Sequence, residues 1–83
     1  MVQLRYFASL RETLGIGSES VALPGTIETV ADLEQWLQQR GAPWDTALAG
    51  DHLLVAVNQV VSKRNTAVSN GDEIAWFPPV TGG

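Results

Sequence analysis

Residues 29–41 read TVADLEQWLQQRG, and this stretch decides the fold because it predicts the main helix of the chain over residues 30–40. Apolar side chains recur along one side at helical spacing. They are Val30, Leu33 and Leu37, with Trp36 beside them. A helix with one apolar stripe needs a partner layer to cover that stripe, so the flanking segments must supply the rest of a core.

Both ends of this helix carry recognisable signals. Thr29 is a plausible N-cap, and the acidic residues Asp32 and Glu34 lie near the end where the helix dipole favours negative charge. Arg40 lies at the other end, and Gly41 can terminate the helix.

The segment before the helix predicts two strands around a short helix. Residues 2–8 begin as an apolar–polar alternation, which indicates a strand with one buried face. Ser9 and Glu12 fit a capping box for a short helix that Gly15 ends. Residues 19–23 then predict a second strand, which Pro24 and Gly25 stop.

The segment after the helix predicts a further helical turn over residues 43–49, closed by Gly50, and then strands. Residues 53–57 form an apolar run that we interpret as a central strand covered on both faces. Asn58-Gln59 predicts a turn, and Val60-Val61 begins the return strand. Asn70-Gly71-Asp72 is a strong turn signal before a last strand over residues 73–77.

This order of elements predicts an α+β fold, with a mixed sheet and one main helix packed on one face. The first two strands are close in sequence, so they are expected to pair antiparallel. The chain of 83 residues has room for one domain, which we place at residues 1–77. Residues 78–83 form an extended tail, because Pro78 and Pro79 have no N–H to donate to a sheet.

Composition excludes several functions. The net charge is −4 and the five basic residues are scattered, which argues against nucleic acid. No apolar run approaches the ~20 residues of a membrane span. There are no cysteines, no metal-ligand cluster is evident, and the lone His52 beside Asp51 fits a solvated loop better than a general base. We therefore expect a cytoplasmic protein that binds no metal or cofactor itself.

The last residues carry the remaining candidate chemistry. Gly82 and Gly83 have no side chains, so they can enter a narrow channel with the terminal carboxylate as the functional group at the tip. Pro78-Pro79 fixes the exit direction, and Val80 and Thr81 complete the arm. From Val80 to Gly83 the reach is roughly 13 Å. The bland alternative is a frayed terminus, which often ends in small residues.

Three segments resemble the molybdopterin synthase small subunit (MoaD) family. Residues 70–83, NGDEIAWFPPVTGG, are similar to the family's ending, and residues 6–12 are similar to its N-terminal motif. Residues 55–58 resemble its central strand and turn, so the resemblance spans the chain. It implies the ubiquitin-like β-grasp fold, in agreement with the α+β order of elements.

The resemblance also implies a mechanism. A ubiquitin-activating-like adenylyltransferase would use ATP to convert the Gly83 carboxylate to an acyl-adenylate. A sulfur donor would then displace AMP and leave a thiocarboxylate. The tail would enter the large catalytic subunit and give its sulfur to cyclic pyranopterin monophosphate (precursor Z), forming the dithiolene of molybdopterin. The catalytic side chains would belong to the large subunit, with which this chain would form a heterotetramer that holds two copies of each.

The family places an apolar docking face beside the tail. By position, Phe7, Val61 and Phe77 would lie on it, with Arg11 as a polar contact. Core packing is the alternative for the two phenylalanines; Trp76 and Phe77, as strand neighbours, must face opposite sides.

Three other functions stay open: a sulfur carrier of the thiamine pathway, a ubiquitin-like protein modifier joined to lysines through Gly83, and a binding module with an inert tail.

Overall fold

The computed structural model describes residues 1–49 and 52–79, and these form five strands and three helices. In chain order the elements are β1 (Val2–Tyr6), α1 (Ala8–Leu14), β2 (Ser18–Val21), α2 (Val30–Gln38), α3 (Trp44–Ala47), β3 (Leu54–Val57), β4 (Val60–Ser62) and β5 (Glu73–Phe77). None of these helices has the length and apolar character that crossing a bilayer requires.

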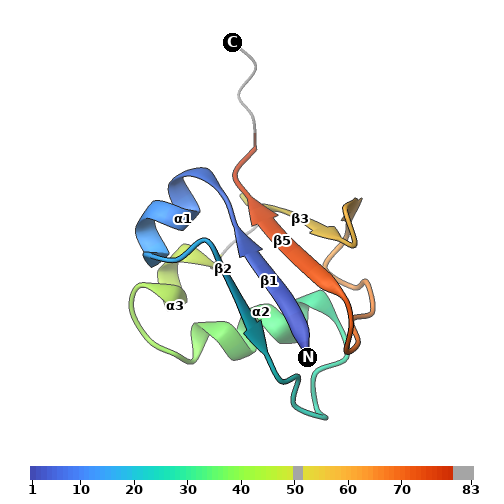
Figure 1. The fold of residues 1–83 in the computed structure, drawn as a ribbon. Coiled ribbons are helices and arrows are strands. Elements are labelled where there is room, and N and C mark those ends of the chain that lie inside the picture. The colour runs from blue at the N-terminus through green and yellow to red at the C-terminus, as the bar shows by residue number, and fades with distance from the viewer. Residues whose placement is uncertain (50–51, 80–83) are drawn as a thin grey trace.

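The strands form one mixed sheet in the order β2-β1-β5-β3-β4 (Figure 1). Strands β1 and β5 pair parallel, whereas the β1–β2, β3–β5 and β3–β4 pairs are antiparallel. The predicted mixed sheet and the predicted antiparallel pairing of the first two strands are therefore confirmed. The long helix α2 lies across one face of the sheet, as expected.

The interpretation of residues 53–57 as a central strand covered on both faces was wrong. Strand β5 holds the central place, and β3 lies between it and the edge strand β4. Leu54 is 39% exposed, because the helices cover only the other face of the sheet. The apolar run of β3 thus has one face in the core and one face on an open sheet surface.

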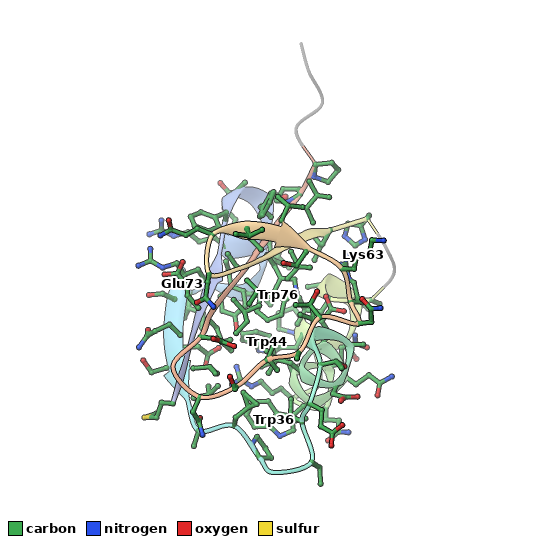
Figure 2. All side chains as sticks on the ribbon, turned by 90° about the vertical axis from the view of Figure 1, so that its right-hand side faces the viewer. Trp36, Trp44, Lys63, Glu73 and Trp76 are labelled. Atoms are coloured by element: carbon green, nitrogen blue, oxygen red, sulfur yellow. The ribbon has the colours of Figure 1, made fainter. Side chains whose placement is uncertain are left out.

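The core lies between the sheet and the helices, as Figure 2 shows for Trp76. Alternate residues of β1 point into it: Val2, Leu4 and Tyr6 are buried, while the residues between them are exposed. Helix α2 contributes Val30, Leu33 and Leu37, each fully buried, as its spacing predicted.

The start of α2 is held by reciprocal hydrogen bonds. The Thr29 hydroxyl accepts from the backbone N–H of Asp32 at 3.2 Å, and the Asp32 carboxylate accepts from the N–H groups of Thr29 and Glu28. These backbone hydrogen bonds hold the pKa of Asp32 below its usual value. The predicted N-cap is confirmed; α2 itself ends at Gln38, two residues earlier than expected.

The capping box predicted at Ser9 was wrong. The N-cap of α1 is Phe7, whose backbone is extended, and no side chain caps it. The Phe7 N–H donates to the Trp76 carbonyl at 3.1 Å, which continues the sheet to Phe7. The helix therefore starts at Ala8 and Ser9 lies inside it. Its other end is as predicted, with Gly15 left-handed at φ 81°.

The remaining boundaries differ by one or two residues from expectation. Strand β2 covers Ser18–Val21 instead of residues 19–23, and α3 is a short helix within the predicted range 43–49. The expected closure at Gly50 lies outside the described residues. The turns at Asn58-Gln59 and before β5 are found where the sequence predicted them.

A bidentate ion pair joins β2 to the end of α2 and makes the stability of the fold depend on pH. Arg40 binds the Glu19 carboxylate at 2.8 and 3.0 Å, and the Tyr6 hydroxyl donates to it at 2.9 Å. Burial raises the pKa of Glu19, but the hydrogen bonds from Arg40 and Tyr6 outweigh this and hold the pKa below its usual 4.5. A carboxyl with a lowered folded-state pKa stabilises the fold above its unfolded pKa and loses that contribution as the pH falls.

We therefore expect the melting temperature to fall with acid partly through Glu19. The difference in melting temperature between the wild type and Glu19→Gln should be largest near pH 7 and shrink toward about pH 3. Thermal melts across that range measure it. A difference that stays constant with pH would contradict the assigned role of this carboxylate.

Candidate functional site

Strand β5 ends with two aromatic residues on opposite sides of the sheet. Trp76 is fully buried, whereas Phe77 is half-buried on the face that the helices leave uncovered. The expectation that the two rings face opposite sides is confirmed. Pro78 and Pro79 follow directly, so the sheet hydrogen bonding stops where the tail begins.

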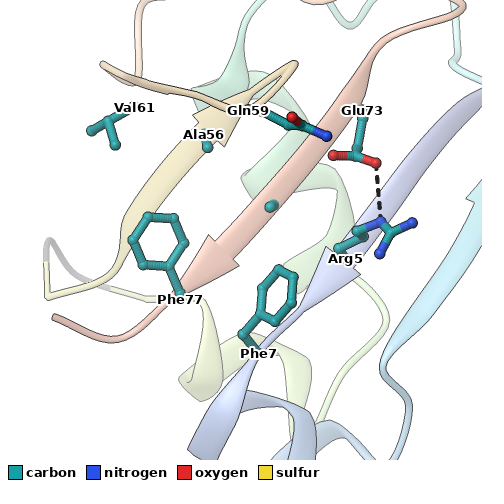
Figure 3. A pocket seen from close by; sticks show the side chains of 8 residues that line it. Arg5, Phe7, Ala56, Gln59, Val61, Glu73 and Phe77 are labelled. Atoms are coloured by element: carbon teal, nitrogen blue, oxygen red, sulfur yellow. Dashed lines mark ion pairs between the residues drawn. The ribbon is translucent and has the colours of Figure 1, made fainter. Parts of the chain in front are cut away.

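The open sheet face is hollowed beside Phe77 (Figure 3). The hollow has a volume of about 380 Å³ and receives residues from β1, β3, β4 and β5 or their ends. Its apolar lining residues are Phe7, Ala56, Val61, Ala75 and Phe77. Phe7 is 44% exposed and Val61 is 66% exposed, and exposed apolar side chains that gather in one patch, unlike ones scattered singly, mark interaction sites.

The structure thus brings together three of the four residues expected on a docking face. Phe7, Val61 and Phe77 line one hollow, and core packing does not account for the exposure of Phe7. Arg11 lies elsewhere: it is on α1, and its Nε atom lies 2.9 Å from the position that a Cβ on Gly17 would take. Its contact with a partner stays a prediction.

The far end of the same hollow is polar. The Arg5 Nε atom lies 3.0 Å from Glu73 Oε2, and Gln59 completes this end. Figure 3 shows the Arg5–Glu73 pair beyond Phe7, on the side away from Phe77. The hollow therefore has an apolar end beside the tail and a polar end farther from it, as in the core and rim of protein interfaces.

A buried carboxylate holds the inner side of β5 at the root of the tail. Glu34 is 7% exposed, and its Oε2 atom accepts a hydrogen bond from the Trp76 indole Nε1 at 2.8 Å. The Arg64 Nε atom lies 3.3 Å from the same oxygen. From the sequence, Glu34 was predicted only as a negative charge near the start of the helix. Its position four residues after Val30, within the apolar stripe, was the signal that could have revealed its burial.

Aromatic packing continues from Trp76 into the first strand. The Tyr6 ring stacks on Trp76 with ring centres 5.8 Å apart, and Trp44 meets Tyr6 edge-on at 5.3 Å. Burial, together with the hydrogen bond to Glu19, raises the pKa of the Tyr6 phenol far above its usual value. Tyr6 therefore stays neutral and serves the core. These contacts fix the strand end from which the tail departs.

His52 is exposed and borders a small hollow of about 130 Å³ with Ser9, Thr13 and Pro78. Among residues 1–49 and 52–79, no group of three or more acidic or histidine side chains could hold a metal ion. Val80, Thr81, Gly82 and Gly83 lie outside the described residues, as does the proposed chemistry at the terminus.

A mixed five-stranded sheet with one long helix across one face defines the ubiquitin-like β-grasp class of proteins. Among solved structures, SAMP1 from Haloferax volcanii matches with a TM-score of 0.70 and 32% identity, over 99% of this chain and 98% of that one. Residues 4–83 match the ThiS family, and the chain belongs to this family.

Two relatives match over the full length of both chains. The molybdopterin synthase sulfur carrier subunit of Haemophilus influenzae is 42% identical over 83 residues, covering 100% of each chain. The protein of the same name from Escherichia coli is 39% identical over 83 residues, again covering 100% of each chain.

Proposed function

We propose that this protein is the sulfur carrier subunit of molybdopterin synthase in molybdenum cofactor biosynthesis. The observation that carries the proposal is the full-length similarity to two carriers of that name, at 42% and 39% identity. The exposed apolar hollow at the root of the Gly-Gly tail supports it, because a carrier must present its terminus to partner proteins. The protein acts in the cytoplasm.

The reacting group is the Gly83 carboxylate. A carboxylate is a poor electrophile, so an adenylyltransferase first joins it to the α-phosphate of ATP and releases pyrophosphate. A sulfur donor then attacks the acyl carbon and displaces AMP, which leaves a thiocarboxylate. When that sulfur is transferred to cyclic pyranopterin monophosphate, water supplies the oxygen that replaces it at the acyl carbon, and the carrier regains its carboxylate. Since the dithiolene contains two sulfurs, two charged carriers are consumed for each molybdopterin.

The fold presents the tail to each partner in turn. Residues 78–83 form the inserted arm, in which Pro78 and Pro79 set the direction and Val80 to Gly83 supply a reach of roughly 13 Å. Phe7, Val61 and Phe77 form the docking face for the large subunit, with which the carrier assembles as a heterotetramer. The catalytic side chains belong to the large subunit, and this chain holds no cofactor of its own.

A protein modifier is the second candidate. The 32% identity to SAMP1, which belongs to the small archaeal modifier proteins, favours it. The same activated Gly83 would then form an isopeptide bond with a lysine of a target protein. A carrier for thiamine synthesis would likewise share the Gly83 chemistry and differ only in its acceptor. The acceptor of the activated terminus therefore separates the candidates.

We expect purified protein, incubated with its adenylyltransferase, ATP and a sulfur donor, to gain the mass of one oxygen-to-sulfur exchange at Gly83. Intact-protein mass spectrometry measures the exchange, and a reaction without ATP is the control. The charged protein, mixed with the large subunit and cyclic pyranopterin monophosphate, should lose that sulfur as molybdopterin forms. Failure to exchange would contradict the carrier function; lysine conjugates of Gly83 in cell extract would favour the modifier.

A further inference from the structure

The turn between β3 and β4 places a glutamine in a conformation that glycine favours. Asn58 and Gln59 have φ values of 52° and 69°. Two successive left-handed residues make the tight hairpin turn whose usual sequence is Asn-Gly. Asparagine tolerates this region, but a side chain such as glutamine's is strained there. Gln59 therefore occupies a position where glycine would adopt the same backbone conformation with less strain.

The turn is held firmly by its neighbours. The Asn58 N–H donates to the Glu73 carbonyl at 2.7 Å, and the Glu73 N–H donates to the Asn58 side-chain oxygen at 3.0 Å. The Asn58 amide also donates to Asp72 at 3.0 Å, which holds the pKa of that carboxyl below its usual value. The Gln59 side chain thus projects from a fixed position.

The Gln59 side chain lies at the polar end of the hollow, near the Arg5–Glu73 pair (Figure 3). Within residues 1–49 and 52–79 its amide makes no hydrogen bond, so the fold draws no polar contact from it. Residues held in sparsely populated backbone conformations cluster at active sites and ligand-binding sites. A second strained residue, Ala8 with φ 55°, follows Phe7 at the opposite, apolar end.

We infer that Gln59 is a specificity-determining residue of the docking face, and that its amide hydrogen-bonds to a main-chain peptide group of the large subunit. This inference rests on the proposed function. A primary amide offers a donor and an acceptor, which match the N–H and C=O of a peptide edge. Arg5 and Glu73 neutralise each other at 3.0 Å, so this end of the hollow favours a neutral group over a charged one.

The location gives this contact its role. The tail and the rings of Phe7 and Phe77 attach the carrier at one end of the hollow, and apolar contacts are non-directional. A hydrogen bond at the far end fixes the rotation of the carrier on its partner. Gln59 thereby selects the partner whose main chain meets it, at the expense of some stability of the free chain.

The test uses substitutions with opposite expected effects on folding and on docking. Gln59→Gly relieves the backbone strain and removes the amide, so the melting temperature should rise by roughly 4 °C while the dissociation constant for the large subunit increases about tenfold. Gln59→Ala removes the amide alone, so the same loss of affinity should come without a rise in melting temperature. Isothermal titration calorimetry and thermal melts of the full chain measure both.

Two further variants serve as a negative and a positive control for docking. Gln35→Ala removes an exposed glutamine from α2 on the other side of the sheet and should leave affinity unchanged. Phe7→Ala should weaken docking at the apolar end. Wild-type affinity in either Gln59 variant, or no gain in melting temperature for Gln59→Gly, overturns the inference. A wild-type chain that does not bind the large subunit contradicts the proposed function itself, and the inference with it.

Discussion

Removal of Gly83 is expected to abolish sulfur transfer and to leave the fold intact. The shortened chain still ends in a glycine carboxylate, so the chemistry of the terminus is unchanged. Its reach is shorter by roughly 3.3 Å. A misplacement of about 1 Å in an active site can lower a rate about 100-fold, so the transfer rate should fall by at least that factor.

The stability of the fold should be almost unchanged by this deletion. Among the described residues, the buried hydrophobic side chains run from Val2 to Trp76 and so end before the tail begins. We expect the melting temperature to shift by less than about 3 °C, as for a surface substitution. Single-turnover molybdopterin formation and a thermal melt, each made beside the wild type, measure the two effects. A large loss of thermal stability would instead give the tail a structural role, and undiminished transfer would contradict the placement of the reaction at Gly83.

The sequence predicted the fold through features with local causes. Helix α2 follows from an apolar stripe and the Thr29 cap, and the turn before β5 follows from Asn70-Gly71. The capping box at Ser9 failed because a nonlocal contact decided the helix start. The Phe7 N–H donates to the carbonyl of Trp76, 69 residues later in the chain, and no local sequence pattern predicts such a pairing.

The candidate site was predicted only in part, because nonlocal contacts also decide which residues meet there. Phe7, Val61 and Phe77 were placed on one face through the resemblance of the chain to a family, and the sheet order brings them to one hollow. The apolar run of residues 53–57 was predicted to be covered on both faces, because composition does not distinguish an apolar face that is open to solvent from one that is buried. The polar end of the hollow depends on the register of β1 against β5, which sets Arg5 near Glu73.

Replacement of Glu34 by alanine is expected to destabilise the fold more than any surface change. The Trp76 indole N–H would lose its acceptor in the core, which costs about 1–3 kcal/mol, and a cavity would remain where the side chain was. Arg64 would lose its ion-pair partner but can turn to water, since its side chain is 30% exposed. We expect a total loss of about 2–4 kcal/mol, or a melting temperature lower by roughly 10–20 °C.

Glu34→Gln is the matched control, because it keeps the shape and a carbonyl oxygen to accept from Trp76 while it removes the charge. It should lose only about 1 kcal/mol, since the Arg64 pair is partly exposed. In a Trp76→Phe background, Glu34→Ala should cost less than in the wild type, and the difference measures the coupling of the two side chains. Equal costs in both backgrounds would mean that the 2.8 Å hydrogen bond contributes nothing. A measured coupling would instead show that a carboxylate inside α2 helps to fix the last buried residue before the tail.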